Sequence, residues 1–206
     1  MPTPSIGTGF RNTSIVLFIA IILINWACAP KKAEEQQPAE QQAATDTEAP
    51  ALTAAYETDT VFGAKYAQTV QAYFNLKDAL VSGDPEATRL AAAAMGKALS
   101  TVNGDLLTGA ARIDWSTFTP ELGKPLREIA NASDLESARA AFSTLSASMW
   151  KTIKAFGGGG KPVYHDYCPM ALKNKGAYWI SSAKEIRNPY FGDSMLDCGY
   201  IKEKLN

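Results

Sequence analysis

The pattern of apolar and polar residues changes along the chain and predicts a leader, a tether, a helical body and a small cap. The run SIVLFIAIILINWA occupies residues 14–27 and has the length of a signal-peptide core, so residues 1–27 are expected to be a signal peptide. The stretch from Pro30 to Ala55 is rich in Gln, Glu, Ala and Pro and has no aromatic residue. Such a segment cannot offset its conformational entropy by burial, so residues 28–58 are expected to form a disordered tether.

Over residues 59–157, apolar side chains recur every three or four positions, which predicts consecutive helices. The first helix is expected to stop at Ser82-Gly83. Asp84-Pro85-Glu86 then supplies an N-cap, a first-turn proline and an early acid for the second helix. Asn103-Gly104 is expected to end it as a C-terminal glycine does. The expected inward residues of this helix are mostly small: Leu90, Ala91, Ala94, Met95, Ala98, Leu99 and Val102.

The third and fourth helical segments carry clear local signals. Pro120 and Pro125 interrupt the third segment, residues 106–130, and predict a kinked helix or two short ones. Ser133-Asp134-Leu135-Glu136 matches a capping box with Ser133 as the N-cap of the fourth helix. The glycine run 157–160 ends that helix and is expected to be a hinge. We therefore predict a mainly α fold, an antiparallel four-helix bundle with a C-terminal cap of loops and short strands over residues 158–206.

Composition and charge exclude several function classes. The formal net charge of −1 offers no bulk attraction for a nucleic acid. The chain has a single histidine, so an alternative triad has no second base, and the glycine run lacks the context of a nucleotide site. We therefore do not expect an enzyme.

The candidate chemistry gathers in the cap. His165, Cys168 and Met170 lie within six residues, and Met195 and Cys198 follow. Thiolate and thioether ligands select soft monovalent ions, so one hypothesis is a copper(I) or silver(I) site formed by these five residues. The other is a Cys168–Cys198 disulfide, which stabilises by about 3 to 4 kcal/mol on the loop-entropy model and is normal in an oxidising compartment. A disulfide would still leave His165, Met170 and Met195 as ligands, so both hypotheses stay open.

The junction after the apolar run has its own pattern. Ala27-Cys28 resembles the lipobox of bacterial lipoproteins, although Asn25 stands where that pattern has an apolar residue. The resemblance implies that Cys28 is lipidated and anchors the protein to a membrane. An uncleaved N-terminal anchor and a signal peptide cut elsewhere are the alternatives. All of them place the folded part outside the cytoplasm, and the first implies a periplasmic or outer-membrane-associated lipoprotein.

The cap also carries longer motifs, YHDYCPMALKNKGAYWISS from residue 164 and KEIRNPYFGDSMLDCG from residue 184. They resemble an uncharacterised bacterial domain family that occurs in lipoproteins and at the C-terminus of membrane fusion adaptors of copper and silver efflux pumps. Tyr167-Cys168-Pro169-Met170 is also similar to the start of a short heavy-metal-binding module of such adaptors, with Ala171 in place of that module's histidine. The resemblance implies an accessory to metal efflux or homeostasis, with efflux components as partners. The alternative is a structural or protein-interaction module clamped by the disulfide.

Overall fold

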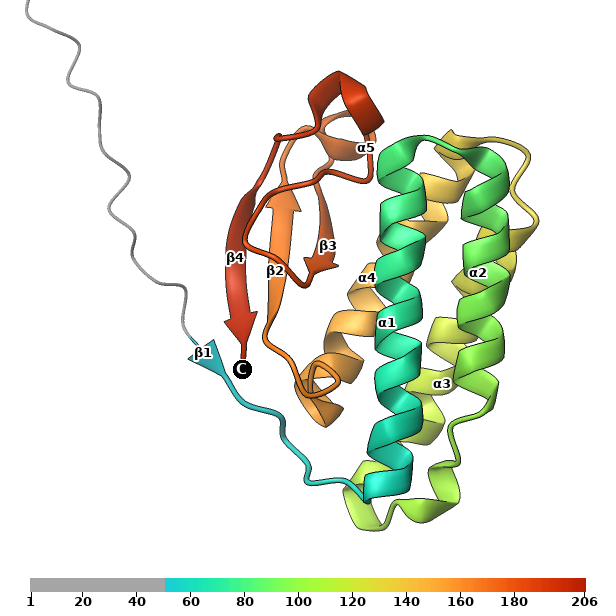
Figure 1. The fold of residues 1–206 in the computed structure, drawn as a ribbon, viewed down its shortest axis with the longest axis vertical. Coiled ribbons are helices and arrows are strands. Elements are labelled where there is room, and N and C mark those ends of the chain that lie inside the picture. The colour runs from blue at the N-terminus through green and yellow to red at the C-terminus, as the bar shows by residue number, and fades with distance from the viewer. Residues whose placement is uncertain (1–50) are drawn as a thin grey trace, which may run out of the picture. The chain divides into compact units, whose positions relative to one another are not determined.

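A computed structural model of the chain describes residues 51–206, and Figure 1 shows its ribbon. The expected signal peptide, Cys28 and the tether as far as residue 50 lie outside the described residues. Residues 51–206 form a mainly helical body and a small C-terminal sheet. The elements in chain order are β1 (Ala51–Leu52), α1 (Thr60–Ser82), α2 (Pro85–Ser100), the 3₁₀ turn η1 (Gly104–Leu106), α3 (Gly109–Ala130), α4 (Leu135–Phe156), β2 (Val163–Cys168), α5 (Ala171–Asn174), β3 (Ala177–Ser181), the 3₁₀ turn η2 (Gly192–Met195) and β4 (Tyr200–Leu205).

The long helices α1 to α4 make the helical body, and each packs against the next one along the chain (Figure 1). Large aromatic side chains fill the space between α1 and α4. The rings of Tyr73 and Phe142 stack with centroids 5.4 Å apart, and those of Phe62 and Phe156 lie at the same separation. Trp115 of α3 meets Phe62 edge-on at 5.0 Å. Such edge-on and offset contacts are the favoured geometries of aromatic pairs. The expectation of a mainly helical, bundle-like body is confirmed.

Local capping signals set the boundary between the first two helices as expected. The Asp59 side chain accepts hydrogen bonds from the backbone of the first turn of α1, and Gly83 ends that helix in the left-handed conformation with φ 69°. The Asp84 side chain accepts from two backbone N–H groups of α2, which begins at Pro85. These contacts satisfy backbone groups that a helix end leaves unpaired.

The other end of α2 differs from the expectation. The helix stops at Ser100, and Asn103 caps η1 instead of closing α2. A Cβ atom at Gly104 would lie 2.3 Å from the Trp115 ring, so this glycine is needed for close packing and not for a helix end. The predicted inward face is confirmed at Met95, Leu99 and Val102 but is wrong in the first half of the helix. Its buried residues are Thr88, Ala92, Met95 and Leu99, whereas Leu90 is 61% exposed. A run of alanines carries too weak a periodicity to define one face.

The third and fourth helices also correct the sequence analysis. Helix α3 runs through Pro120 and Pro125 as one helix, so of the two expected alternatives the pair of short helices is wrong. Its buried residues Trp115, Leu122 and Ile129 lie on one face, so packing on the core offsets the local cost of the prolines, which is about 3 kcal/mol for each. In α4 the N-cap is Asp134, which accepts from the Ser137 N–H at 2.8 Å.

The expected capping box of α4 is therefore absent from the described structure. The Ser133 hydroxyl donates to the Asp134 carboxylate, and the Glu136 carboxylate reaches away to the ammonium group of Lys173 at 2.7 Å. A carboxylate one residue later competes with serine as the helix cap, and both residue types are good caps. Local sequence alone does not choose between them.

The C-terminal sheet has the strand order β1-β4-β2-β3, with β2 antiparallel to both of its neighbours and β1 a two-residue addition parallel to β4. Its outer strand β3 lies against the helices (Figure 1). The Ile180 N–H donates to the Tyr73 hydroxyl of α1 at 3.1 Å, and the Tyr190 hydroxyl donates to the Tyr178 carbonyl at 2.6 Å. The free edge of β3 is thus paired with tyrosines, which prevents edge-to-edge association there.

Two segments expected to be flexible are packed against the domain. Residues 51–58 belong to the expected tether, yet the N–H groups of Ala55 and Tyr56 donate to carbonyls of α4 and the Tyr56 hydroxyl donates to Asp114 at 2.6 Å. The expected hinge is a tight turn. A Cβ atom at Gly158 would lie 2.5 Å from the Lys161 carbonyl oxygen, so the turn leaves no room for a side chain.

Candidate functional site

The sheet brings the two cysteines of the cap together. Cys168 ends β2 and Cys198 lies two residues before β4, and the pairing of Tyr167 with Tyr200 in these antiparallel strands places one end beside the other. The sulfur atoms are 2.6 Å apart, and both cysteines carry free thiols. Cys168 is fully buried, whereas Cys198 is half-buried. A pair that is separated by 30 residues in sequence therefore meets at one end of the sheet.

The surroundings of Cys198 favour its protonated thiol. The neighbouring Cys168 sulfur, through a side-chain hydrogen bond, and desolvation raise the pKa of Cys198 to about 11. Since the thiolate is the form that attacks and that binds metal, Cys198 is a weak nucleophile and a weak ligand near neutral pH. Cys198 is therefore held mainly as the thiol near neutral pH.

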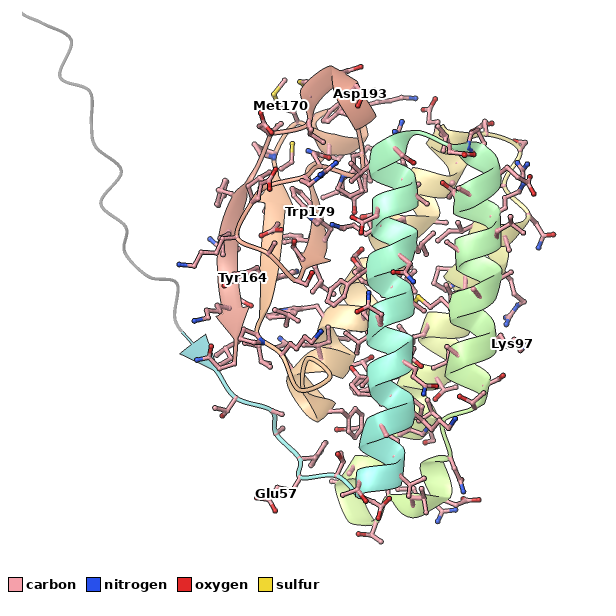
Figure 2. The ribbon with its side chains drawn as sticks, in the orientation of Figure 1. Glu57, Lys97, Tyr164, Met170, Trp179 and Asp193 are labelled. Carbon is pink, nitrogen blue, oxygen red and sulfur yellow. The ribbon has the colours of Figure 1, made fainter. Side chains whose placement is uncertain are left out.

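Both candidate methionines lie on turns next to the thiols. Met170 follows Pro169 after the end of β2, and its side chain is 47% exposed. Met195 ends η2 and is half-buried, and its carbonyl accepts from the Cys198 N–H at 3.3 Å. Figure 2 shows Met170 and Asp193 of η2 at the same end of the sheet. The structure thus brings Cys168, Cys198 and these two turns together.

His165 is not part of this cluster. It lies three residues before Cys168 on β2, and residues three apart on a strand point to opposite faces of the sheet. Its ring is stacked between Trp150 at 4.3 Å and Tyr178 at 4.7 Å. Burial lowers the pKa of His165 to about 4, against the opposing effect of Glu203, whose carboxylate is 3.7 Å from Nδ1. The expected ligand set of five residues is therefore divided between two faces of the sheet.

Asp166 is a buried acid that the sequence analysis missed. It is fully buried, and neither carboxylate oxygen has a hydrogen-bond partner within residues 51–206. Desolvation raises the pKa of Asp166 to about 7, while the ammonium group of Lys77, itself buried, acts in the opposite direction. The alternation of β2 is the signal that could have found it, because it puts Asp166 on the same inward face as Cys168.

The common metal-binding side chains do not form a cluster in the described part of the chain. Residues 51–206 contain no group of three or more histidine, cysteine, aspartate or glutamate side chains placed to hold an ion. A metal site here would have to use the two thiols and the thioethers beside them.

Within residues 51–206 no helix is both long and apolar enough to span a bilayer.

The aromatic residues of the cap form a surface on the His165 face of the sheet. The rings of Tyr167 and Tyr178 lie 4.4 Å apart, and those of Tyr167 and Tyr200 lie 5.8 Å apart. Tyr178 is 38% exposed and Tyr200 is 50% exposed. We call Tyr167, Tyr178 and Tyr200 the tyrosine surface. It lies at the end of β2 that carries Cys168.

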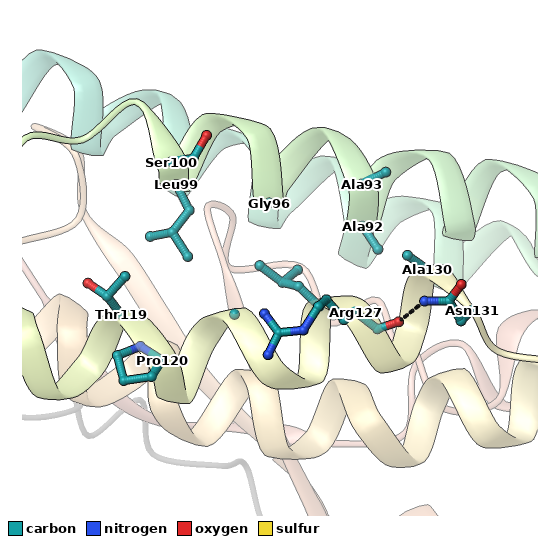
Figure 3. A pocket seen from close by; sticks show the side chains of 12 residues that line it. Ala92, Ala93, Gly96, Leu99, Ser100, Thr119, Pro120, Arg127, Ala130 and Asn131 are labelled. Carbon is teal, nitrogen blue, oxygen red and sulfur yellow. Dashed lines mark hydrogen bonds between the residues drawn. The ribbon is translucent and has the colours of Figure 1, made fainter.

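A separate hollow lies on the helical body. An apolar groove of about 640 Å³ lies between α2 and α3. Figure 3 shows side chains that line it. Ala92 and Gly96 line one side, and the Arg127 side chain extends across the other, with its guanidinium close to Gly123. The Asn131 amide donates to the Arg127 carbonyl at 2.8 Å. The lining has no cysteine, histidine or acid, so this groove supplies neither soft metal ligands nor a general acid or base.

Comparison with known families matches residues 69–160 to a family described as a protein of unknown function (DUF3347). The matched range runs from the middle of α1 to the glycine turn after α4, so it covers most of the helical body. It ends before β2, and the cap motifs that carry the resemblance to efflux adaptors lie beyond it. The chain thus contains an uncharacterised domain of unknown function. Searches of curated proteins and of solved structures find no match.

Proposed function

We propose that this chain is an extracytoplasmic, lipid-anchored accessory protein, in which a four-helix bundle supports a disulfide-clamped sheet that binds another protein. The observation that carries the proposal is the exposed tyrosine surface at the end of the sheet where the two thiols meet. Tyrosine is enriched at protein interfaces because its ring buries a large area while its hydroxyl stays hydrogen-bonded. A stapled sheet presents such rings at low entropic cost.

The separation of the two sulfur atoms favours a disulfide over a shared ion. A tetrahedral ion with metal–sulfur distances of about 2.3 Å holds two thiolates about 3.8 Å apart. The Cys168 and Cys198 sulfurs are 2.6 Å apart, which is longer than a disulfide bond of about 2.05 Å and shorter than the spacing around an ion, so a disulfide requires the smaller movement. Outside the cytoplasm such a pair normally oxidises. The loop of 30 residues that the bond closes corresponds to about 3 to 4 kcal/mol of stability.

The clamp is tested by thiol counting and unfolding. Full-length protein exported to the periplasm and purified without reductant is expected to show Cys168 and Cys198 joined, by mass spectrometry of peptides. Reduction is expected to lower the free energy of unfolding by about 3 to 4 kcal/mol, and a Cys168→Ser, Cys198→Ser double variant is expected to lose this response. Two free thiols after aerobic export would refute the clamp.

The binding surface is tested by photo-crosslinking in cells. A photoreactive side chain at Tyr178 is expected to yield a discrete protein adduct, and the same group at Ile113, which is 66% exposed on α3, serves as the matched control. The adduct is expected to disappear when Tyr200 is changed to Ser. Equal labelling from both positions, or an adduct that survives Tyr200→Ser, would remove the tyrosine surface from the proposal. Heavy-metal efflux components are the first partners to look for among the adducts.

A second candidate function is the binding of copper(I) or silver(I) when the thiols are reduced. The specific observation is that Met170 and Met195 lie on the turns next to the Cys168 and Cys198 thiols, so two thioethers and two thiols, the ligand types that select soft monovalent ions, come from one end of the sheet. Native mass spectrometry of reduced protein titrated with copper(I) is expected to show one bound ion, which is lost in a Met170→Leu, Met195→Leu double variant. His165→Gln is the control and is expected to retain the ion. Retention by the methionine variant, or no binding at all, would refute this function.

The lipid anchor is tested independently of the cap. Labelling of growing cells with a radioactive fatty acid is expected to mark the full chain, and Cys28→Ala is expected to abolish the label. A label that persists in Cys28→Ala would assign the anchor to another residue.

A further inference from the structure

A second hollow lies between the start of α4 and the turn that follows β2. It has a volume of about 470 Å³, and its lining includes Arg139 of α4, Lys175, Leu172 and Phe191. It does not include the thiols or the tyrosine surface. The hollow is therefore distinct from the groove on the helical body and from the proposed binding surface.

The charge of this hollow is positive and only partly compensated. Lys173 and Glu136 pair with each other at 2.7 Å, and both are also in the lining. Within residues 51–206, Lys175 and Arg139 form no ion pair. Two positive charges are thus left facing a hollow whose other walls include the apolar side chains of Leu172 and Phe191.

The Arg139 guanidinium is held in place by backbone oxygens. Its Nε donates to the Pro189 carbonyl at 2.9 Å, and its Nη2 donates to the Leu80 carbonyl at 3.3 Å. The Nη1 group has no hydrogen bond to any residue of the described range, so two of its donors stay available. Burial lowers the pKa of Arg139, which shows that its charge is partly desolvated. An anion in the hollow would offset that cost.

The turn beside Arg139 is held in an unusual conformation. Leu172, Lys173 and Asn174 have φ values of 51°, 61° and 65°, so three consecutive residues other than glycine are left-handed. Each such residue costs about 1 to 2 kcal/mol, and local strain of this kind concentrates at ligand sites. Leu172 and Lys173 of this turn and Lys175 directly after it are on the wall of the hollow.

We propose that this hollow is a binding site for a small organic anion, a carboxylate or phosphate attached to an apolar group. The anionic group is held by Arg139 and Lys175, and the apolar group packs against Phe191 and Leu172. A planar guanidinium fixed at two points offers the paired donors that carboxylates and phosphates prefer. The apolar wall adds selectivity against inorganic anions.

The test is calorimetric titration of the full chain in a neutral detergent with four compounds. Benzoate and phenyl phosphate carry both features of the ligand, benzyl alcohol lacks the charge, and inorganic phosphate lacks the apolar group. At least one of the first two is expected to bind with one-to-one stoichiometry. Benzyl alcohol and inorganic phosphate are expected to bind at least about tenfold more weakly, as the loss of a charge-assisted hydrogen bond or of ring burial implies.

Variants assign the binding to this hollow. Arg139→Gln and Lys175→Gln are each expected to lower the affinity for the organic anion by about tenfold or more. Lys97→Gln, on α2 far along the helical body (Figure 2), is the matched control and is expected to have no effect. If Arg139→Gln does not fold, as circular dichroism will show, Lys175→Gln decides. No binding by either organic anion, or equal binding by Lys175→Gln and Lys97→Gln, would overturn the proposal.

Discussion

His165 and Asp166 are adjacent on β2, and their pKa values are displaced in ways that make opposite contributions to stability. Burial raises the pKa of Asp166 from 3.8 to about 7, and burial lowers the pKa of His165 from 6.5 to about 4. The folded protein holds a proton on Asp166 more tightly than the unfolded chain does, and it holds a proton on His165 less tightly. The two residues therefore respond to pH with opposite signs.

The magnitudes follow from linkage. Each pH unit between the folded and unfolded pKa of a group changes the free energy of unfolding by about 1.4 kcal/mol. The contribution of Asp166 is fully present below about pH 4 and is lost as the pH rises to about 7, for a total of about 4 kcal/mol. The contribution of His165 is fully present above about pH 6.5 and is lost as the pH falls to about 4, for a total of about 3 kcal/mol. Between about pH 4 and 6.5 the two slopes cancel.

Two substitutions separate the slopes. Asp166→Asn removes the acid and keeps its size, so as the pH rises from 4 to 7 the free energy of unfolding of the variant is expected to gain about 4 kcal/mol relative to that of the wild type. His165→Phe keeps a ring between Trp150 and Tyr178. As the pH rises over the same range, the free energy of unfolding of this variant is expected to fall by about 3 kcal/mol relative to that of the wild type. The double variant is expected to follow the wild-type slope again.

The assay is equilibrium denaturation in urea at a series of pH values, with the wild type measured beside each variant. Other titrating groups are common to all four proteins and cancel in the differences. Only the slope with pH is compared, so a constant loss from changed packing does not affect the result. Parallel curves for the wild type and both single variants would refute the reasoning, because they would show that neither group changes its proton affinity on folding.

The remaining predictions concern stability and use the same unfolding assay. Tyr73→Phe is expected to cost about 1 to 3 kcal/mol, since it removes the hydrogen bond to the buried Ser146 hydroxyl and leaves the Ile180 N–H without a partner. Tyr66→Phe removes a buried hydroxyl that has no partner in residues 51–206 and is expected to be neutral or stabilising. Equal losses in both would contradict the hydrogen-bond assignment. Gly158→Ala is expected to cost about 1 to 3 kcal/mol because its Cβ atom would overlap the Lys161 carbonyl, whereas Gly96→Ala, with no atom within 4 Å, is expected to stabilise α2 by about 0.5 to 1 kcal/mol. If Gly158→Ala causes no loss of stability, the glycine run is a flexible hinge and not a tight turn. Lys173→Gly is expected to raise the free energy of unfolding by about 1 kcal/mol, because glycine adopts the left-handed conformation of this residue without strain. Lys184→Gly, in a loop, is the control and is not expected to raise it. A lower stability of Lys173→Gly would show that the ion pair with Glu136 contributes more to the turn than the strain costs.

The sequence by itself determined the features that depend on near neighbours. Asp59, Gly83, Asp84 and Pro85 act within one turn of the chain, so the junction between α1 and α2 was predictable from residue type. The three- and four-residue spacing of large apolar side chains identified the helices for the same reason. The cap could be distinguished from the helical body because its apolar residues alternate with polar ones and its turn residues are frequent, whereas the helices repeat every three or four residues.

Only the tertiary structure decided features that depend on contacts between distant residues. Packing on the core carries α3 through both prolines, and contact with Trp115, not the end of α2, explains Gly104. The register between β2 and β4 brings Cys168 to Cys198, while the alternation of β2 keeps His165 on the other face and buries Asp166. Ligand-type residues that are close in sequence were therefore divided, and residues 30 positions apart were joined. Spacing along a strand specifies which face a side chain occupies, but the partner it meets there depends on the strands and helices that fold against it.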